Sequence, residues 1–419
     1  MTDRIRGALS ARSGVASSVA VHEVFLLAAA LWFLGKFVRY AFPPLFDEFQ
    51  GAYAVSTTEI GLAYSGFLVL YALLQFPSGA LADRLGSARV ITAGAVIAGL
   101  GAATLVLSPP FVVLVGAMAV IGAGTGAHKT VSIRLLSNVY PGHLGRALGV
   151  FDTIGAMGGV VAPLIIAAIL AFGLGGWPGF FGILGLIFIV VGVVFVSRTA
   201  SDTRVTDDAT GTEEVLPWRS YRQTFSRLPV LAFALVTVLV AFAYNGLVSF
   251  LPLLLITDGG VQPALASALY SVLFVASIVQ IASGEAADRF GPLRTLTVCL
   301  VVATLGMIGL LVAISAGGEL TSLMALVIIG CVVLAIGIGA HGYRPARDVY
   351  VVSLVPDATT GGTLGVIRTL LMGSAALAPT VVGYLGDVYG LFEAFVVITA
   401  VAVAAVVTAT SLAVATRGT

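Results

Sequence analysis

Long apolar segments recur along this chain and limit what it can fold into. A helix needs about 20 apolar residues to cross the hydrocarbon core of a bilayer. Runs of that size come in two sets of six, at 22–46, 56–82, 88–107, 110–136, 143–171 and 177–197, then at 229–257, 263–286, 292–315, 320–350, 358–386 and 389–415. The sequence therefore predicts an all-α membrane protein of about 12 spanning helices.

The composition agrees with residence in a lipid bilayer. Hydrophobic residues make up 59% of the 419 residues and charged residues 10%, whereas soluble domains are about 25% charged. A net charge of +1 gives no basis for binding nucleic acid. Cys299 and Cys331 lie inside apolar runs without the spacing of a metal site. We expect no metal and no cofactor.

An internal repeat divides the chain into two halves. QFPSGALADRLG (75–86) returns as QIASGEAADRFG (280–291), and Gly-Ala-His at 126–128 returns at 339–341. Copies with six helices each share one topology, so an axis along the membrane normal relates them, with the substrate path between them. We predict a six-helix bundle at 1–197, a cytoplasmic linker at 198–228 and a second six-helix bundle at 229–419.

Arginines gather at the breaks on one side of the predicted helices. The breaks on the other side, at 47–59, 257–263 and 386–393, contain acids but no Lys or Arg. Cytoplasmic loops are the ones enriched in Lys and Arg. We therefore expect a multi-pass protein of the cell membrane with both termini in the cytoplasm. The arginines of the cytoplasmic side are Arg84, Arg89, Arg134, Arg146, Arg198, Arg227, Arg289, Arg294, Arg347 and Arg417.

The repeated segment contains a family signature. GALADRLGSAR (79–89) resembles the motif between the second and third helices of the major facilitator superfamily, and GEAADRFGPLR (284–294) is its weaker copy. Ser87 and Ala88 replace basic residues of that motif. The resemblance implies two pseudo-symmetric six-helix bundles, alternating access, a small-molecule substrate and function as a monomer.

The resemblance also implies a cytoplasmic gate. In this family the motif's Asp meets an Arg of the fourth helix, which carries over here to Asp83 with Arg134. The repeat gives Asp288 with Arg347. Alternatively, these arginines only follow the positive-inside rule. The other gate candidates are the remaining residues of the two motif copies, Gly79, Arg84, Gly86 and Arg289.

Several charged residues lie deep inside predicted spans. A charge at a helix centre costs about 2.5–3.5 kcal/mol on insertion scales. The first span carries Lys36 and Arg39, and the fourth carries Lys129, the other lysine of the chain. Asp152 and Arg368 lie at similar depth in the fifth and eleventh spans. Arg39 has the alternative of extending its charged end to the membrane surface.

These residues define a predicted substrate site. We assign substrate binding to the deep cations Lys36, Arg39, Lys129 and Arg368, together with Tyr244, Asn245 and His341. Asp152 and His128 are candidates for proton coupling. For Asp152, a permanent ion pair with Lys36, Lys129 or Arg368 is an equal alternative. The histidines are at least as well explained as core residues.

The predicted function is secondary transport. No phosphate-binding loop for ATP is present, so an ion gradient or exchange must supply the energy. The excess of deep cations predicts a small organic or inorganic anion as substrate, moved with protons or by exchange. Proton-coupled multidrug efflux is the first alternative, and a non-transporting membrane sensor is the second. An enzyme would need a nucleophile or a metal cluster, and the sequence offers neither.

Overall fold

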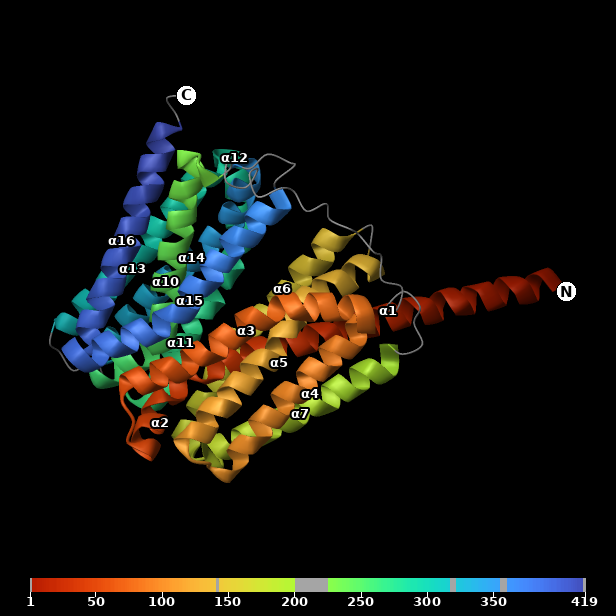
Figure 1. Cartoon of the computed structure of the whole chain (residues 1–419), viewed down its shortest axis with the longest axis horizontal. Helices are drawn as coiled ribbons and strands as arrows, with labels where there is room; N and C mark the ends of the chain where they lie inside the picture. Colours follow the sequence, from red (N-terminus) through yellow and green to blue (C-terminus); the bar gives the residue numbers. More distant parts are fainter. Residues whose placement is uncertain (1, 141–142, 200–224, 317–321, 355–359, 417–419) are drawn as a thin grey trace. The chain divides into compact units, whose positions relative to one another are not determined.

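The chain is almost entirely α-helical (Figure 1). The computed structural model describes residues 2–140, 143–199, 225–316, 322–354 and 360–416. Among these residues, 12 helical segments are long and apolar enough to cross a membrane. This confirms the predicted all-α membrane fold. Residues 200–224 of the predicted linker and Arg417 lie outside the described residues.

The helices of the first half follow the apolar runs closely. α1 reaches well beyond its apolar run toward the N-terminus, and α2 continues the first span after a short turn at the proline pair Pro43 and Pro44. The elements are α1 (Thr2–Ala41), α2 (Phe46–Tyr53), α3 (Thr57–Leu85), α4 (Ser87–Ala103), α5 (Phe111–Val139), α6 (Leu144–Phe172) and α7 (Gly176–Thr199).

The second half repeats this arrangement. Its second span is divided into α11 and α12 by a tighter turn at Ala276–Ile278, a stretch without Pro or Gly that the sequence did not mark as a break. The elements are α10 (Leu228–Thr257), α11 (Pro263–Val275), α12 (Val279–Phe290), α13 (Pro292–Ser315), α14 (Leu323–Leu354), α15 (Thr360–Tyr389) and α16 (Leu391–Ala415).

Glycines with positive φ end the helices that carry the repeated motif. Gly86 has φ +87° and Gly291 has φ +93°, at the same position of the two copies. Residues with a Cβ rarely adopt this conformation, so the motif needs Gly there. Gly390, with φ +109°, ends α15 in the same way. The chain turns sharply at all three sites.

The chain forms two compact units. One contains Met1–Arg39, Leu70–Gly158 and Pro178–Gly211, and the other contains Tyr40–Val69, Gly159–Trp177 and Thr212–Thr419. In the second unit, parts of α1, α3 and α6 therefore pack with the helices of the second half. The division into halves at 1–197 and 229–419 rests on the sequence repeat and stays a prediction.

Small residues bring neighbouring helices close together in each unit. A Cβ added to Gly94 of α4 would lie 2.5 Å from the carbonyl oxygen of Gly124 of α5. In the second unit, a Cβ on Gly339 of α14 would lie 2.4 Å from the carbonyl oxygen of Cys299 of α13. Small residues permit such backbone approaches between membrane helices. The backbones at these crossings leave no room for a larger side chain.

Candidate substrate site and gates

α1 places a lysine and a tryptophan on one face. Trp32 and Lys36 are one turn apart, so their side chains are neighbours on the helix surface. The ammonium nitrogen of Lys36 lies 5.0 Å from the centroid of the Trp32 ring. Trp32 itself is 5% exposed. On the next turn, the guanidinium carbon of Arg39 lies 5.6 Å from the Tyr71 ring, so Arg39 packs against α3.

Lys129 of α5 meets the same tryptophan and pairs with Asp152 of α6. The ammonium group of Lys129 forms an ion pair with the Asp152 carboxylate. Its nitrogen also lies 5.2 Å from the Trp32 centroid and 5.6 Å from that of Phe151. Of the partners considered for Asp152, Lys129 is therefore the one that the structure places beside it.

Two aromatic rings support these charges. Trp32 and Phe151 are stacked nearly parallel, with centroids 5.9 Å apart and an angle of 6° between the planes. Both rings are buried. We call Trp32, Lys36, Lys129, Phe151 and Asp152 the lysine–tryptophan cluster. Its charges are two ammonium groups against one carboxylate, so it retains a net positive charge.

Glycines of α6 let α1 approach the cluster. A Cβ on Gly155 would lie 2.1 Å from Nε1 of Trp32, and one on Gly158 would lie 2.7 Å from the carbonyl oxygen of Phe33. Both distances are too short for a real Cβ. The glycine-rich segment at 155–159 is therefore a packing surface for α1.

His128 lies on a different face of α5 from Lys129. Its ring is fully buried, with its centroid 6.3 Å from that of Phe188, and it lies beside the backbone of Leu31 and Ile91. These contacts join α5 to α1, α4 and α7. They favour the interpretation of His128 as a core residue over a role in proton coupling.

The second unit contains the remaining predicted substrate residues. The Tyr244 ring of α10 packs edge-on against His341 of α14, with centroids 6.1 Å apart, and the guanidinium of Arg344 lies 5.3 Å from Tyr244. Asn245 is buried and donates a hydrogen bond to the Ala241 carbonyl at 2.8 Å. Arg368 of α15 is exposed. Convergence of these residues with Lys36 and Lys129 on one cavity stays a prediction.

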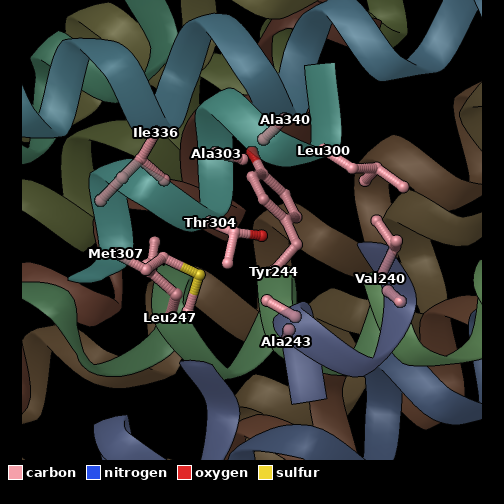
Figure 2. A pocket seen from close by; sticks show the side chains of 12 residues that line it. Val240, Ala243, Tyr244, Leu247, Leu300, Ala303, Thr304, Met307, Ile336 and Ala340 are labelled. Carbon is pink, nitrogen blue, oxygen red and sulfur yellow. The ribbon is translucent and has the colours of Figure 1, made fainter. Parts of the chain in front are cut away.

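A small cavity lies behind Tyr244 (Figure 2). Its volume is about 30 Å³, between α10, α13, α14 and α16. Tyr244 and Thr304 carry the hydroxyl groups of a wall that is otherwise apolar, with Met307 and Ile336 among its residues. This space suits a water molecule rather than an organic substrate.

The repeated motif forms one of the two expected ion pairs. Asp83 at the end of α3 pairs with Arg134 of α5, as carried over from the family. In the second copy, Arg347 binds the adjacent Asp348 at 2.7 Å, and no Asp288–Arg347 pair exists within the described residues. The expected second pair is therefore not formed in this structure, where Asp348 binds Arg347, and it stays a prediction.

The other motif residues have mainly local contacts. A Cβ on Gly79 would contact Cγ2 of Thr130 at 3.8 Å, so α3 and α5 lie close there. Arg84 is exposed, and the Arg289 guanidinium lies 5.4 Å from the ring of the adjacent Phe290. Gly86 supplies the turn described above.

Asp387 of α15 caps the beginning of α3. Its carboxylate accepts hydrogen bonds from the backbone N–H groups of Thr57 at 2.9 Å and Thr58 at 2.8 Å. The first N–H groups of a helix lack partners within the helix, and its positive dipole end favours an anion. Asp387 was not predicted from the sequence as a functional residue. The signal was available, since GYLGDVYG (383–390) keeps the Gly, Asp and Gly positions of the repeated motif.

Further contacts continue along α3 and α15. Ser65 accepts a hydrogen bond from the Thr380 hydroxyl at 2.7 Å, and a Cβ on Gly61 would lie 2.4 Å from the carbonyl oxygen of Pro379. Segments from the two halves of the sequence are therefore tightly packed here. We call this set, with Asp387 and Thr58, the α3–α15 contact.

Comparisons with known proteins agree with this architecture. A family model described as Major Facilitator Superfamily matches residues 24–337. The hexuronate transporter of Bacillus subtilis is 25% identical, over 82% of this chain and 83% of that protein. The probable chloroplastic anion transporter 2 of Oryza sativa is 24% identical, over 90% of this chain and 73% of that protein. The match to the probable sulfoacetate transporter SauU of Cupriavidus necator, at 28% identity, covers 34% of this chain and 33% of that protein.

Solved structures share the fold at low sequence identity. A bacterial homologue of the human lysosomal transporter Spinster, in an inward-facing and unoccupied conformation, has a TM-score of 0.78 and 18% identity, over 94% of this chain and 97% of that one. A D-xylose–proton symporter has a TM-score of 0.75 and 12% identity, over 93% of this chain and 97% of that one. With the family match over most of the sequence, the chain belongs to the Major Facilitator Superfamily and is a membrane transporter rather than an enzyme.

Proposed function

We propose that this chain is a secondary transporter of a small anion, with Lys36 and Lys129 binding the substrate. The lysine–tryptophan cluster is the observation that carries the proposal. Two ammonium groups lie against one indole deep in the first unit, and one carboxylate accompanies them. Ammonium groups gathered in this way attract a negatively charged ligand.

The relatives support a negatively charged substrate. The names of three matched proteins specify sulfoacetate, hexuronate and an anion. The first two are small molecules with carboxylate or sulfonate groups, the type of group that lysine ammonium binds. All three relatives are named as transporters, which supports transport over a sensor role.

We assign coupling to Asp152. Its carboxylate pairs with Lys129, and its side chain is 54% exposed against 17% for the lysine. Protonation of Asp152 would release Lys129 for the substrate, which links anion binding to protons. An anion that replaces Asp152 on the lysine without protonation would give exchange instead. Both modes use the same ion pair.

Alternating access needs closure at each end of the helices in turn. We place the termini in the cytoplasm of the cell, as the arginine distribution indicates. Asp83 with Arg134 then belongs to the cytoplasmic gate, and the α3–α15 contact closes the outer side. This assignment makes Asp387 an outer counterpart of the motif's Asp83.

Binding to the purified protein tests the substrate class. We would measure thermal unfolding with sulfoacetate, D-glucuronate, phosphate and, for the efflux alternative, tetraphenylphosphonium. We expect stabilisation by at least one anion and loss of that stabilisation in Lys36→Gln and Lys129→Gln. Arg146→Gln, which removes an exposed cation of α6, is the matched control. Stabilisation by the hydrophobic cation alone would favour multidrug efflux.

A further inference from the structure

We infer that Trp32 is the positioning residue of the anion site: its indole holds Lys36 and Lys129 in place whether or not Asp152 is paired with Lys129. This inference rests on the proposed function, and it adds a residue that neither the sequence motifs nor the deep charges identified.

Both lysines contact the side chain of Trp32. Both ammonium nitrogens lie about 5 Å from its ring centroid, so they are no more than about 10 Å apart. Both distances are within the range of a cation–π contact. The negative face of an aromatic ring attracts cations without adding a formal charge. Trp32 can therefore keep two like charges near each other without neutralising them.

Asp152 differs from Trp32 in how firmly it is held. Its side chain is 54% exposed, whereas Trp32 is 5% exposed and stacked on the buried Phe151. A substrate carboxylate or sulfonate can therefore replace Asp152 on Lys129 while both rings stay in place. Lys129 keeps its contacts with Trp32 and Phe151 during that exchange. The rings, rather than Asp152, fix where the ammonium group meets the anion.

Gly155 is what allows the indole to lie in this position. A Cβ there would be 2.1 Å from Nε1, 2.3 Å from Cδ1 and 3.0 Å from Cε2 of Trp32. These atoms belong to a rigid ring, so the whole indole would have to move. Gly149, one to two turns earlier on α6, has no atom within 4 Å of its added Cβ. The two glycines are therefore a matched pair for an alanine substitution.

The two lysines make a direct measurement possible. Lys36 and Lys129 are the lysines of the sequence, so reductive methylation with isotope-labelled formaldehyde marks them and the N-terminal amine. Methylation keeps the positive charge, and carbon NMR then reports the ring-current shift that the indole produces. We expect two shifted lysine signals in the wild-type protein without any anion. In Trp32→Leu the shift of Lys36 should vanish, and that of Lys129 should fall to the part that Phe151 produces. Both shifts should change in Gly155→Ala and stay unchanged in Gly149→Ala.

Affinity for sulfoacetate and D-glucuronate is measured on the same variants without methylation. We expect the affinity for the bound probe to fall by about tenfold or more in Trp32→Leu and Gly155→Ala, and by much less in Trp32→Phe, which keeps an aromatic face. If Trp32 had only a structural role, both Trp32→Phe and Trp32→Leu would lower thermal stability. The affinity of Trp32→Phe would then be no higher than that of Trp32→Leu.

The outcomes separate the two claims. Unshifted lysine signals in the wild-type protein, or wild-type affinity in a folded Trp32→Leu variant, would overturn the positioning role. A wild-type protein that binds neither probe nor any other anion would instead contradict the proposed function. In that case the ring-current shifts still decide whether Trp32 positions the lysines.

Discussion

At the scale of single residues, the ion pair between Lys129 and Asp152 is the central feature of the site. The sequence identified both residues from their depth in predicted spans but left three possible partners for Asp152. The structure pairs Asp152 with Lys129, because α5 and α6 bring these side chains together beside Phe151. Lys36 shares the indole of Trp32 instead. The pair therefore joins the proposed substrate site to the carboxylate proposed for coupling.

Replacing Asp152 with Asn tests this connection. The variant removes the carboxylate that competes for Lys129, so we expect anion affinity to rise at neutral pH and to lose its increase toward acidic pH. Transport should no longer depend on the proton gradient, whereas exchange continues. The control is Asp258→Asn, which changes an exposed carboxylate at the end of α10. Binding that keeps the wild-type pH dependence in Asp152→Asn would exclude Asp152 as the coupling group.

Trp32 shows what a sequence leaves out at this scale. Deep charges are conspicuous in an apolar helix, so Lys36, Lys129 and Asp152 were predicted directly. Aromatic residues are common in such helices, so the sequence did not mark Trp32 as a site residue. Its spacing of four residues from Lys36 was available, but its contact with Lys129 depends on how α1, α5 and α6 pack. That packing in turn depends on Gly155.

At the scale of helices, the sequence predicted the number and positions of the spanning helices, because these depend on local composition. The apolar runs gave the spans. The turns at Gly86 and Gly291 of the repeated motif are findings of the structure. The cap formed by Asp387 was missed because it joins residues 330 positions apart in the sequence. The Asp288–Arg347 pair stays a prediction, since Arg347 binds its neighbour Asp348 on α14 in this structure.

The crossing of α4 and α5 gives a prediction about stability. A Cβ at Gly124 would lie 2.5 Å from the Gly94 carbonyl oxygen, and backbone cannot move aside as a flexible side chain can. We expect Gly124→Ala to lower the free energy of unfolding by about 1–3 kcal/mol. Gly116→Ala on the same helix, where nothing lies within 4 Å, should have little effect. Thermal unfolding in detergent compares the two, and equal melting temperatures would refute the close crossing.

The α3–α15 contact gives a prediction about gating. Asp387→Ala removes the acceptor of the Thr57 and Thr58 N–H groups, so we expect the contact to open more often. A cysteine at Ser65, which is buried beside Thr380, should then react faster with a thiol reagent. The experiment uses a background without Cys299 and Cys331. Asp258→Ala is the control, and an unchanged rate in Asp387→Ala would argue against a role in closure.

At the scale of the whole molecule, the fold was predictable because the membrane leaves few solutions. In the bilayer, backbone N–H and C=O groups need hydrogen-bond partners within the protein, and an α-helix supplies them within one segment. The apolar runs have the length of such a spanning helix. The internal repeat in the sequence added the prediction of two halves. The regrouping of Tyr40–Val69 and Gly159–Trp177 with the second half was not predictable, since it depends on contacts such as that of Phe46 with Phe250.

The orientation of the molecule is a prediction from its arginines. Single cysteines at Ala52 and Ser226, again without the native cysteines, lie at exposed positions near opposite ends of the spans. An impermeant thiol reagent added to intact cells should label the cysteine at Ala52 and spare the one at Ser226. Both should react after the cells are lysed. Labelling of Ser226→Cys in intact cells would reverse the orientation proposed for both gates.

Counterflow in proteoliposomes tests the proposed anion transport most directly. Vesicles that contain the purified protein are loaded with the anion that stabilises it and then diluted into a trace of the same anion in radiolabelled form. We predict transient accumulation of label by the wild-type protein, loss of accumulation in Lys36→Gln and Lys129→Gln, and retention in Arg146→Gln. Equal accumulation in all four proteins would contradict the assignment of the lysine–tryptophan cluster as the anion site.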